Sequence, residues 1–101
     1  MNVILGTLTE EKQRNLSMQE TYKTEISKLP KGSITIKKRG NQAYCYIKYR
    51  QGQKIITQYI GVYNEKMIAD LNAQIEKRHH FEQLLRNLKA EYKLIVKVVK
   101  D

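Results

Sequence analysis

Basic and tyrosine side chains gather in the segment KKRGNQAYCYIKYRQGQKIITQYIG, which covers residues 37–61. The segment holds four tyrosines and six Lys or Arg residues and contains no Asp or Glu. Cations bind phosphate oxygens and tyrosine rings stack on exposed bases, so this combination is typical of surfaces that bind single-stranded nucleic acid. A two-stranded ribbon with the same residues could instead enter the major groove of a duplex. The candidate binding residues are Lys37, Lys38, Arg39, Tyr44, Tyr46, Lys48, Arg50 and Lys54.

The positive charge of the chain is concentrated in its middle third. The formal net charge of the 101 residues is +9. Residues 1–30 carry four basic and four acidic side chains, and residues 31–60 carry seven basic and none acidic. Residues 61–101 carry eight basic and six acidic side chains. A polyanion or an acidic protein is the partner that such a distribution favours. The alternative is that the cations only protect sheet edges from aggregation and that the tyrosines only pack across strands.

The other polar residues do not form a catalytic or metal-binding pattern. Cys45 is the single cysteine, with no His near it in the sequence, and we interpret it as an inert buried thiol in a reducing cytoplasm. Adjacent His79 and His80 point about 100° apart on a helix, so they cannot bind one ion from one face. Glu76 and His80 would supply only two ligands. We therefore expect no metal, no cofactor and no enzymatic activity.

A single α+β domain over residues 1–101 must position the candidate residues. Residues 7–29 are predicted to form its first helix, with Thr7 and Glu10 as a capping box, Thr9 as an alternative N-cap, and an irregular tail at residues 1–6. Pro30 ends this helix, because the residue before a proline is kept out of the helical region. The apolar stripe of the helix consists of Met18, Tyr22, Ile26 and Leu29.

Residues 33–61 are predicted to form a three-stranded antiparallel meander. Gly40-Asn41 suits a tight turn because both residues tolerate a positive φ, and residues 51–53 form the next turn. Alternation places Cys45 and Ile47 in the core, together with Ile34 and Ile36. The outer face is expected to carry Lys37, Arg39, Tyr44, Tyr46, Lys48 and Arg50.

A long second helix is predicted over residues 64–99, with Asn64 as its cap. Neither Gly nor Pro interrupts residues 62–101. The two helices are expected to pack together and over the isoleucine face of the sheet. The long helix exceeds the length of that sheet, so its end is expected to pair with a second copy in a homodimer. The β-branched residues leave open whether residues 94–101 form helix or strand. No apolar run approaches the ~20 residues of a membrane span, so no membrane partner is expected.

The segment from residue 29 onward resembles small proteins of phages and integrative elements of Gram-positive bacteria. Their pattern is Leu-Pro-Lys-Gly-Ser, then Tyr-x-Tyr-x-x-Tyr-Arg, then a strand end of Tyr-Ile/Leu-Gly. The matching residues are Leu29–Ser33, Tyr44, Tyr46, Tyr49, Arg50 and Tyr59–Gly61. The likeness covers about residues 29–90 and implies a mobile-element protein in the cytoplasm of a bacterial host cell.

Small single-domain proteins of this origin include anti-CRISPR inhibitors of RNA-guided nucleases. The resemblance therefore favours an inhibitor that competes for guide RNA or docks on an acidic surface of the nuclease. The expected partner is a nucleic acid, either guide RNA or DNA, or a nucleic-acid-binding nuclease. A DNA-binding accessory or regulatory factor and a structural dimerisation module are the two alternatives.

Overall fold

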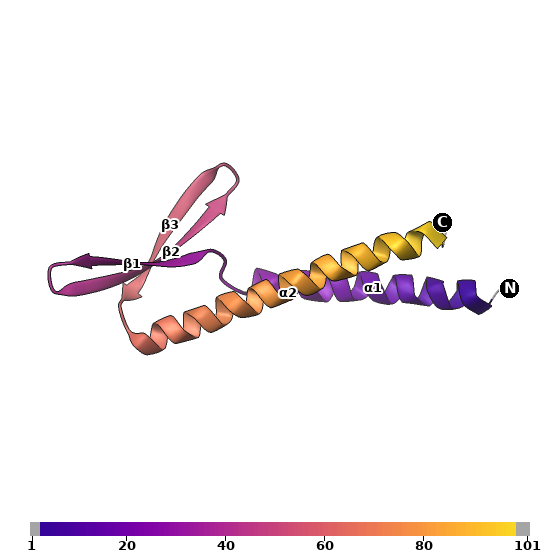
Figure 1. Cartoon of the computed structure of the whole chain (residues 1–101), viewed down its shortest axis with the longest axis horizontal. Coiled ribbons are helices and arrows are strands. Elements are labelled where there is room, and N and C mark those ends of the chain that lie inside the picture. The colour runs from indigo at the N-terminus through magenta and orange to yellow at the C-terminus, as the bar shows by residue number, and fades with distance from the viewer. Residues whose placement is uncertain (1–2, 99–101) are drawn as a thin grey trace. The chain divides into compact units, whose positions relative to one another are not determined.

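The chain forms a helix, then a sheet, then a second helix. The computed structural model describes residues 3–98. Its elements are α1 (Val3–Ser27), β1 (Ser33–Arg39), β2 (Gln42–Gln51), β3 (Lys54–Val62) and α2 (Glu65–Val98) (Figure 1). This order confirms the predicted α+β class. Two compact units divide the chain: the first contains the segments before residue 29 and after residue 78, and the second contains residues 29–78. A single domain over residues 1–101 stays a prediction.

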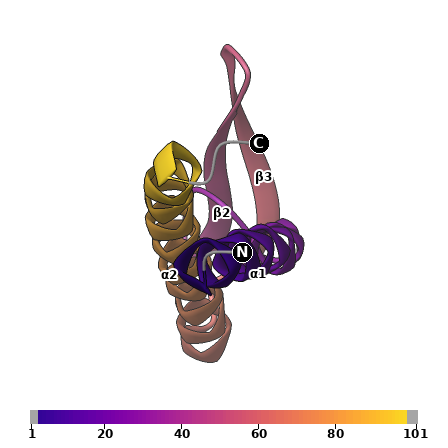
Figure 2. The same cartoon turned by 90° about the vertical axis from the view of Figure 1, so that its right-hand side faces the viewer.

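In the first unit, α1 and the second half of α2 pack as an antiparallel pair. Figures 1 and 2 show the two helices side by side. Asn15 on α1 contacts Leu88, and Tyr22, further along α1, has its ring centroid 5.6 Å from that of Phe81. Residue numbers thus fall along α2 as they rise along α1. These contacts confirm the prediction that the two helices pack together.

Helix α1 has different ends from those predicted. It starts at Val3 instead of Thr7 and ends at Ser27, so Leu29 lies outside it. Thr7 and Thr9 are therefore inside the helix, and the predicted caps are wrong, as is the irregular tail for residues 3–6; residues 1–2 of that tail lie outside the described residues. The steric effect of Pro30 on the preceding residue is consistent with the earlier end.

The buried face of α1 is more polar than the predicted stripe. Asn15 and Gln19 are buried, whereas Met18 is 38% exposed. Gln19 Nε2 donates to Asn15 Oδ1 at 2.6 Å, so the two amides partly satisfy each other. Tyr22 and Ile26 are half-buried, in line with the prediction. The prediction for Met18 is wrong because only apolar side chains were counted.

In the second unit, the three strands form an antiparallel sheet in the order β1-β2-β3. Two-residue turns join them, with φ of 63° at Gly40 and 64° at Gly52. No non-glycine residue among those described has a positive φ, so Asn41 does not use the positive φ that asparagine tolerates. A positive φ at only the first turn position is typical of type II′ turns, which match the twist of the strands. The twist is strong, and the two hairpin ends diverge (Figure 1).

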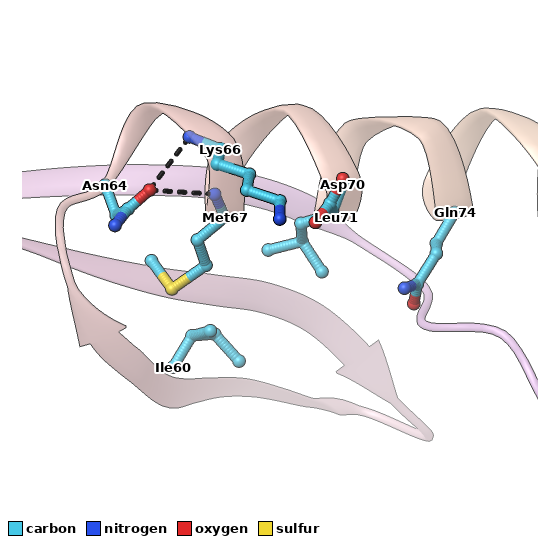
Figure 3. A pocket seen from close by; sticks show the side chains of 7 residues that line it. All are labelled: Ile60, Asn64, Lys66, Met67, Asp70, Leu71 and Gln74. Atoms are coloured by element: carbon cyan, nitrogen blue, oxygen red, sulfur yellow. Dashed lines mark hydrogen bonds between the residues drawn. The ribbon is translucent and has the colours of Figure 1, made fainter.

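The core of this unit lies between one face of the sheet and the first part of α2. Cys45 is fully buried, and Ile47 and Ile75 are nearly so. The side chains of Met67 and Leu71 on α2 line the same hollow as Ile60 of β3 (Figure 3). The start of α2 therefore packs beside β3 at Ile60 and Gly61, which agrees with the predicted cover for this part of the sheet.

The core prediction is wrong for Ile36, which is 45% exposed. Its pairing with Cys45 puts it on the core face. However, β1 is an edge strand, so no further strand lies beside Ile36 on its outer side. The sequence pattern gives the face of a residue but not how far the covering helix extends over it.

Helix α2 begins where predicted. The Asn64 side-chain oxygen accepts hydrogen bonds from the backbone N–H groups of Lys66 and Met67, at 2.9 and 3.2 Å (Figure 3). The helix continues to Val98, so residues 94–98 are helical. The last predicted helical position, residue 99, lies outside the described residues. Within residues 3–98, neither helix is apolar enough over a sufficient length to cross a bilayer.

Candidate nucleic-acid interface

Tyrosine and basic side chains share the face of the sheet opposite buried Cys45. Directly paired residues of antiparallel strands point to the same side, so the register identifies the members of each face. Lys37 pairs with Tyr44, and Tyr46 pairs with Tyr59. We call this surface the tyrosine face, and its basic and aromatic residues are Lys37, Arg39, Tyr44, Tyr46, Lys48, Arg50 and Tyr59. The first six of these had been predicted to lie together.

A bulge in β3 shapes one end of the tyrosine face. Cys45 pairs with Gly61 while its neighbour Tyr46 pairs with Tyr59, so β3 contains one extra residue at Ile60. A bulge of this kind breaks the alternation of the strand and increases its local twist. As a result Tyr59 and Val62 lie on the same face, although three positions separate them.

Three tyrosines of this face form a cluster around a hollow. The Tyr59 ring lies 5.4 Å from that of Tyr46 and 6.3 Å from that of Tyr44, between centroids. Both pairs are tilted, at 60° and 52°, instead of stacked flat. Together with Arg39, the rings line an open hollow of about 290 Å³. The hollow therefore offers ring surface and one guanidinium to a ligand.

Lys37 adds a second cation beside this cluster. Its Nζ lies 4.9 Å from the centroid of the Tyr46 ring. A cation–π contact at an exposed site contributes about 0.5–1 kcal/mol, which favours this position without removing the charge. Lys48 and Arg50 continue the positive surface further along β2. All four cations of the tyrosine face are exposed.

No carboxylate neutralises this surface within the described residues. No Asp or Glu occurs between Glu25 and Glu65. Within residues 3–98, no ion pair involves the six candidate cations, whereas α1 carries local pairs such as Arg14 with Glu11. The positive charge of the sheet is therefore available to an external anion.

Two of the candidate residues, Lys38 and Lys54, lie on the other face. Lys38 pairs with Ala43, and Lys54 pairs with Gln51, positions that alternate with those of the tyrosine face. These two lysines therefore do not lie on the tyrosine face, and their part in binding stays a prediction. Both belong to edge strands, where exposed lysines protect against strand addition.

Tyr59 belongs to the hollow but was not among the candidate residues. Its position follows from the turn at Gly52, which sets Gln51 opposite Lys54 and fixes the pairing of the following residues. Counting back from that turn leads to Tyr46 opposite Tyr59. The signal was thus present in the sequence, but it depends on knowing which two residues form the turn.

The segment before β1 contacts both α2 and β2. Arg78 Nη1 donates to the Leu29 carbonyl oxygen at 2.7 Å. Lys31 Nζ lies 5.4 Å from the centroid of the Tyr49 ring. Gly32 has a φ of 108°, and a Cβ on it would overlap the carbonyl oxygen of Lys48. This part of the Leu-Pro-Lys-Gly-Ser motif therefore has a structural reason for its glycine.

A second hollow, of about 370 Å³, lies beside the start of α2 (Figure 3). Ile60, Met67 and Leu71 form its apolar side, and Lys66 and Asp70 are among its polar residues. The charges of those two residues are opposite, so this hollow does not share the positive character of the tyrosine face.

Cys45 and the histidines do not provide an evident reactive centre. Burial raises the pKa of the Cys45 thiol, which favours its protonated, unreactive form. Among the residues that the structure describes, no three His, Cys, Asp or Glu side chains gather where they could hold a metal ion. The absence of enzymatic activity stays a prediction.

Comparison with known proteins identifies a family. No curated protein and no solved structure matches the chain significantly. The family model described as a domain of unknown function, DUF6788, matches residues 7–70. The match includes most of α1, all three strands and the start of α2. Since it covers more than half of the chain, the protein belongs to the DUF6788 family.

Proposed function

We propose that this protein binds nucleic acid, or the nucleic acid of a nucleoprotein, through the tyrosine face, without catalysing a reaction. The observation that carries the proposal is the coexistence of exposed cations and a ring-lined hollow on one face. Cations bind the sugar–phosphate backbone, and exposed tyrosine rings bind bases. An inhibitor of an RNA-guided nuclease would use such a surface against guide RNA, and that role, which depends on the resemblance to mobile-element proteins, stays a prediction.

The position of the cations on the strands favours binding over edge protection. Lys48 and Arg50 lie on β2, which is the central strand of the sheet. A central strand has both hydrogen-bonding edges occupied, so cations on it are not needed to prevent strand addition. Edge protection would account for the lysines of β1 and β3 but not for these two residues.

Two double variants with the same change in net charge test the proposal. Arg39→Glu with Arg50→Glu reverses two charges on the tyrosine face. Lys38→Glu with Lys54→Glu reverses two charges on the opposite face. Fluorescence anisotropy with labelled single-stranded RNA and DNA, over a series of salt concentrations, measures affinity for each protein. Circular dichroism checks that both variants are folded.

We expect the unmodified protein to lose affinity linearly with the logarithm of salt concentration, because bound cations release counterions from phosphates. The first double variant should bind much more weakly and show a shallower salt slope. The second should show a smaller loss that reflects net charge alone. Equal losses in both variants would refute the assignment of binding to the tyrosine face. Absence of binding to RNA and DNA at low salt would overturn the proposal.

A further inference from the structure

The hollow among Tyr44, Tyr46 and Tyr59 has a defined shape and a defined charge. Tyr44 and Tyr46 are half-buried on the central strand, so their rings are held in place by the sheet. Tyr59 is 52% exposed and leaves ring surface accessible to a ligand. Arg39 completes the lining. A fitting ligand would be flat, able to stack on tyrosine, and attached to an anion.

We propose that this hollow is a base-binding site, which takes one unstacked nucleobase of a single strand while Arg39 contacts an adjoining phosphate. The inference rests on the proposed function and adds a specific role for Tyr59. A base stacked within a duplex keeps its faces covered by its neighbours, so only an unpaired or splayed base can enter. The site therefore predicts a preference for single strands over duplexes.

Aromatic clusters also bind quaternary ammonium groups, and the charges here argue against that ligand. A cation site of this kind depends on ring faces that are free of other cations. Lys37 already lies over the Tyr46 ring, and the Arg39 guanidinium lines the hollow itself. Both would repel a cationic ligand and attract a phosphate. The same charges favour a nucleotide over an uncharged aromatic ligand.

Comparison with an abasic strand distinguishes the binding of a base from the binding of phosphates. The probes are a labelled 12-nucleotide oligothymidylate, a 12-unit abasic DNA strand, and a 12-base-pair duplex. All three carry phosphates, but only the first presents unstacked bases. Anisotropy titrations of the full chain at one fixed salt concentration compare the three affinities.

We expect oligothymidylate to bind about five- to 150-fold more tightly than the abasic strand, the range that one stacked base provides. The duplex should not show this gain in affinity over the abasic strand. Equal binding of the thymidylate and abasic strands would refute the base-binding site while leaving phosphate binding by the tyrosine face intact. Absence of binding to all three probes would overturn both proposals.

Three tyrosine variants test whether the tighter binding of oligothymidylate depends on the hollow. Tyr59→Ala removes an exposed ring and should abolish most of the difference between thymidylate and abasic strands. Tyr59→Phe retains the ring and should preserve the difference. Tyr63→Ala is the matched control, because Tyr63 is 41% exposed and does not line the hollow. An undiminished difference in folded Tyr59→Ala, or an equal loss in Tyr63→Ala, would refute the assignment.

Discussion

The side chain of Asn15 donates a hydrogen bond to the carbonyl oxygen of Leu88, 73 positions later in the chain, at 2.8 Å. Asn15 is 2% exposed and also accepts a hydrogen bond from Gln19, which is itself buried. A buried amide is costly unless it is hydrogen-bonded, so an alignment of the helices that breaks these bonds is disfavoured. We infer that the two amides help to set the register of the helix pair.

Asn15→Ala is expected to lower the free energy of unfolding by about 1–3 kcal/mol. The substitution leaves the Gln19 amide without its acceptor in a buried place, and an unsatisfied buried polar group has a cost of that size. Urea denaturation followed by circular dichroism measures the change. The matched control is Gln13→Ala, because Gln13 is exposed on the same helix.

A double-mutant cycle with Gln19→Ala checks the mechanism. If the two amides act as a pair, the double variant should lose less stability than the sum of the single variants, by about 0.5–3 kcal/mol. Additive losses would show that the residues contribute independently, and a loss in Asn15→Ala no larger than that in Gln13→Ala would contradict the assigned role.

Gly32→Ala is expected to destabilise the sheet unit more than Gly40→Ala. Both glycines have a positive φ, so alanine strains the backbone at each position. A Cβ at position 32 would also overlap the Lys48 carbonyl and lie 2.9 Å from Tyr49 Cβ, whereas nothing lies within 4 Å of one at position 40. The additional overpacking should make the loss of unfolding free energy larger by about 1–3 kcal/mol. Equal losses in urea denaturation would show that Gly32 is not held against β2.

Alternation and turn chemistry were sufficient to predict the strands and the two faces of the sheet. Lys48 and Arg50 follow Tyr44 and Tyr46 at intervals of two, and a strand leaves no choice about their side. The bulge at Ile60 was not predictable in this way, because its sequence signal is weak and its effect depends on the pairing of β3 with β2. The bulge lies beyond the Tyr46–Tyr59 pair, so Tyr59 was missed because the register was not counted from the Gly52 turn, and only the placement of Val62 opposite Tyr44 depends on the bulge.

The helices were predictable in existence and only partly in detail. The Asn64 cap could be predicted because it is a local feature. Its side chain bonds to backbone groups only two and three residues away. The buried face of α1 is not local, because it is defined by contacts with a segment more than 50 residues later. Asn15 and Gln19 look like surface residues until their partners in space are known.

Asn64→Ala is expected to lower the free energy of unfolding by about 1 kcal/mol, the usual contribution of a helix cap. The variant loses the acceptor for the Lys66 and Met67 N–H groups at the start of α2. Asn64→Ser retains a capping oxygen and serves as the control, with an expected loss of a few tenths of a kcal/mol. Urea denaturation compares the three proteins. A serine variant as unstable as the alanine variant would indicate that packing of Asn64, not capping, is the source of the effect.

Cys45 is expected to resist alkylation in the folded protein and to react after unfolding in urea. Its side chain is fully buried, and burial raises the pKa of the thiol above its ordinary value of 9.0. Between pH 9.0 and the raised pKa, the folded state therefore keeps the thiol proton that the unfolded state has lost. The resulting stability is fully present below pH 9.0 and is lost as the pH rises from there through the raised pKa.

The loss of stability above pH 9.0 should be smaller in Cys45→Ala, because this variant lacks the thiol and keeps every other side chain. Urea denaturation of both proteins between pH 8 and about 10.5 measures the difference, and reaction with iodoacetamide reports thiol access. Rapid alkylation of the folded protein, or an identical pH dependence in both proteins, would contradict the burial of Cys45 in the core of the sheet unit. The result would then also remove the basis for assigning the tyrosine face to the outer side of the sheet, since the two faces are defined by the same alternation.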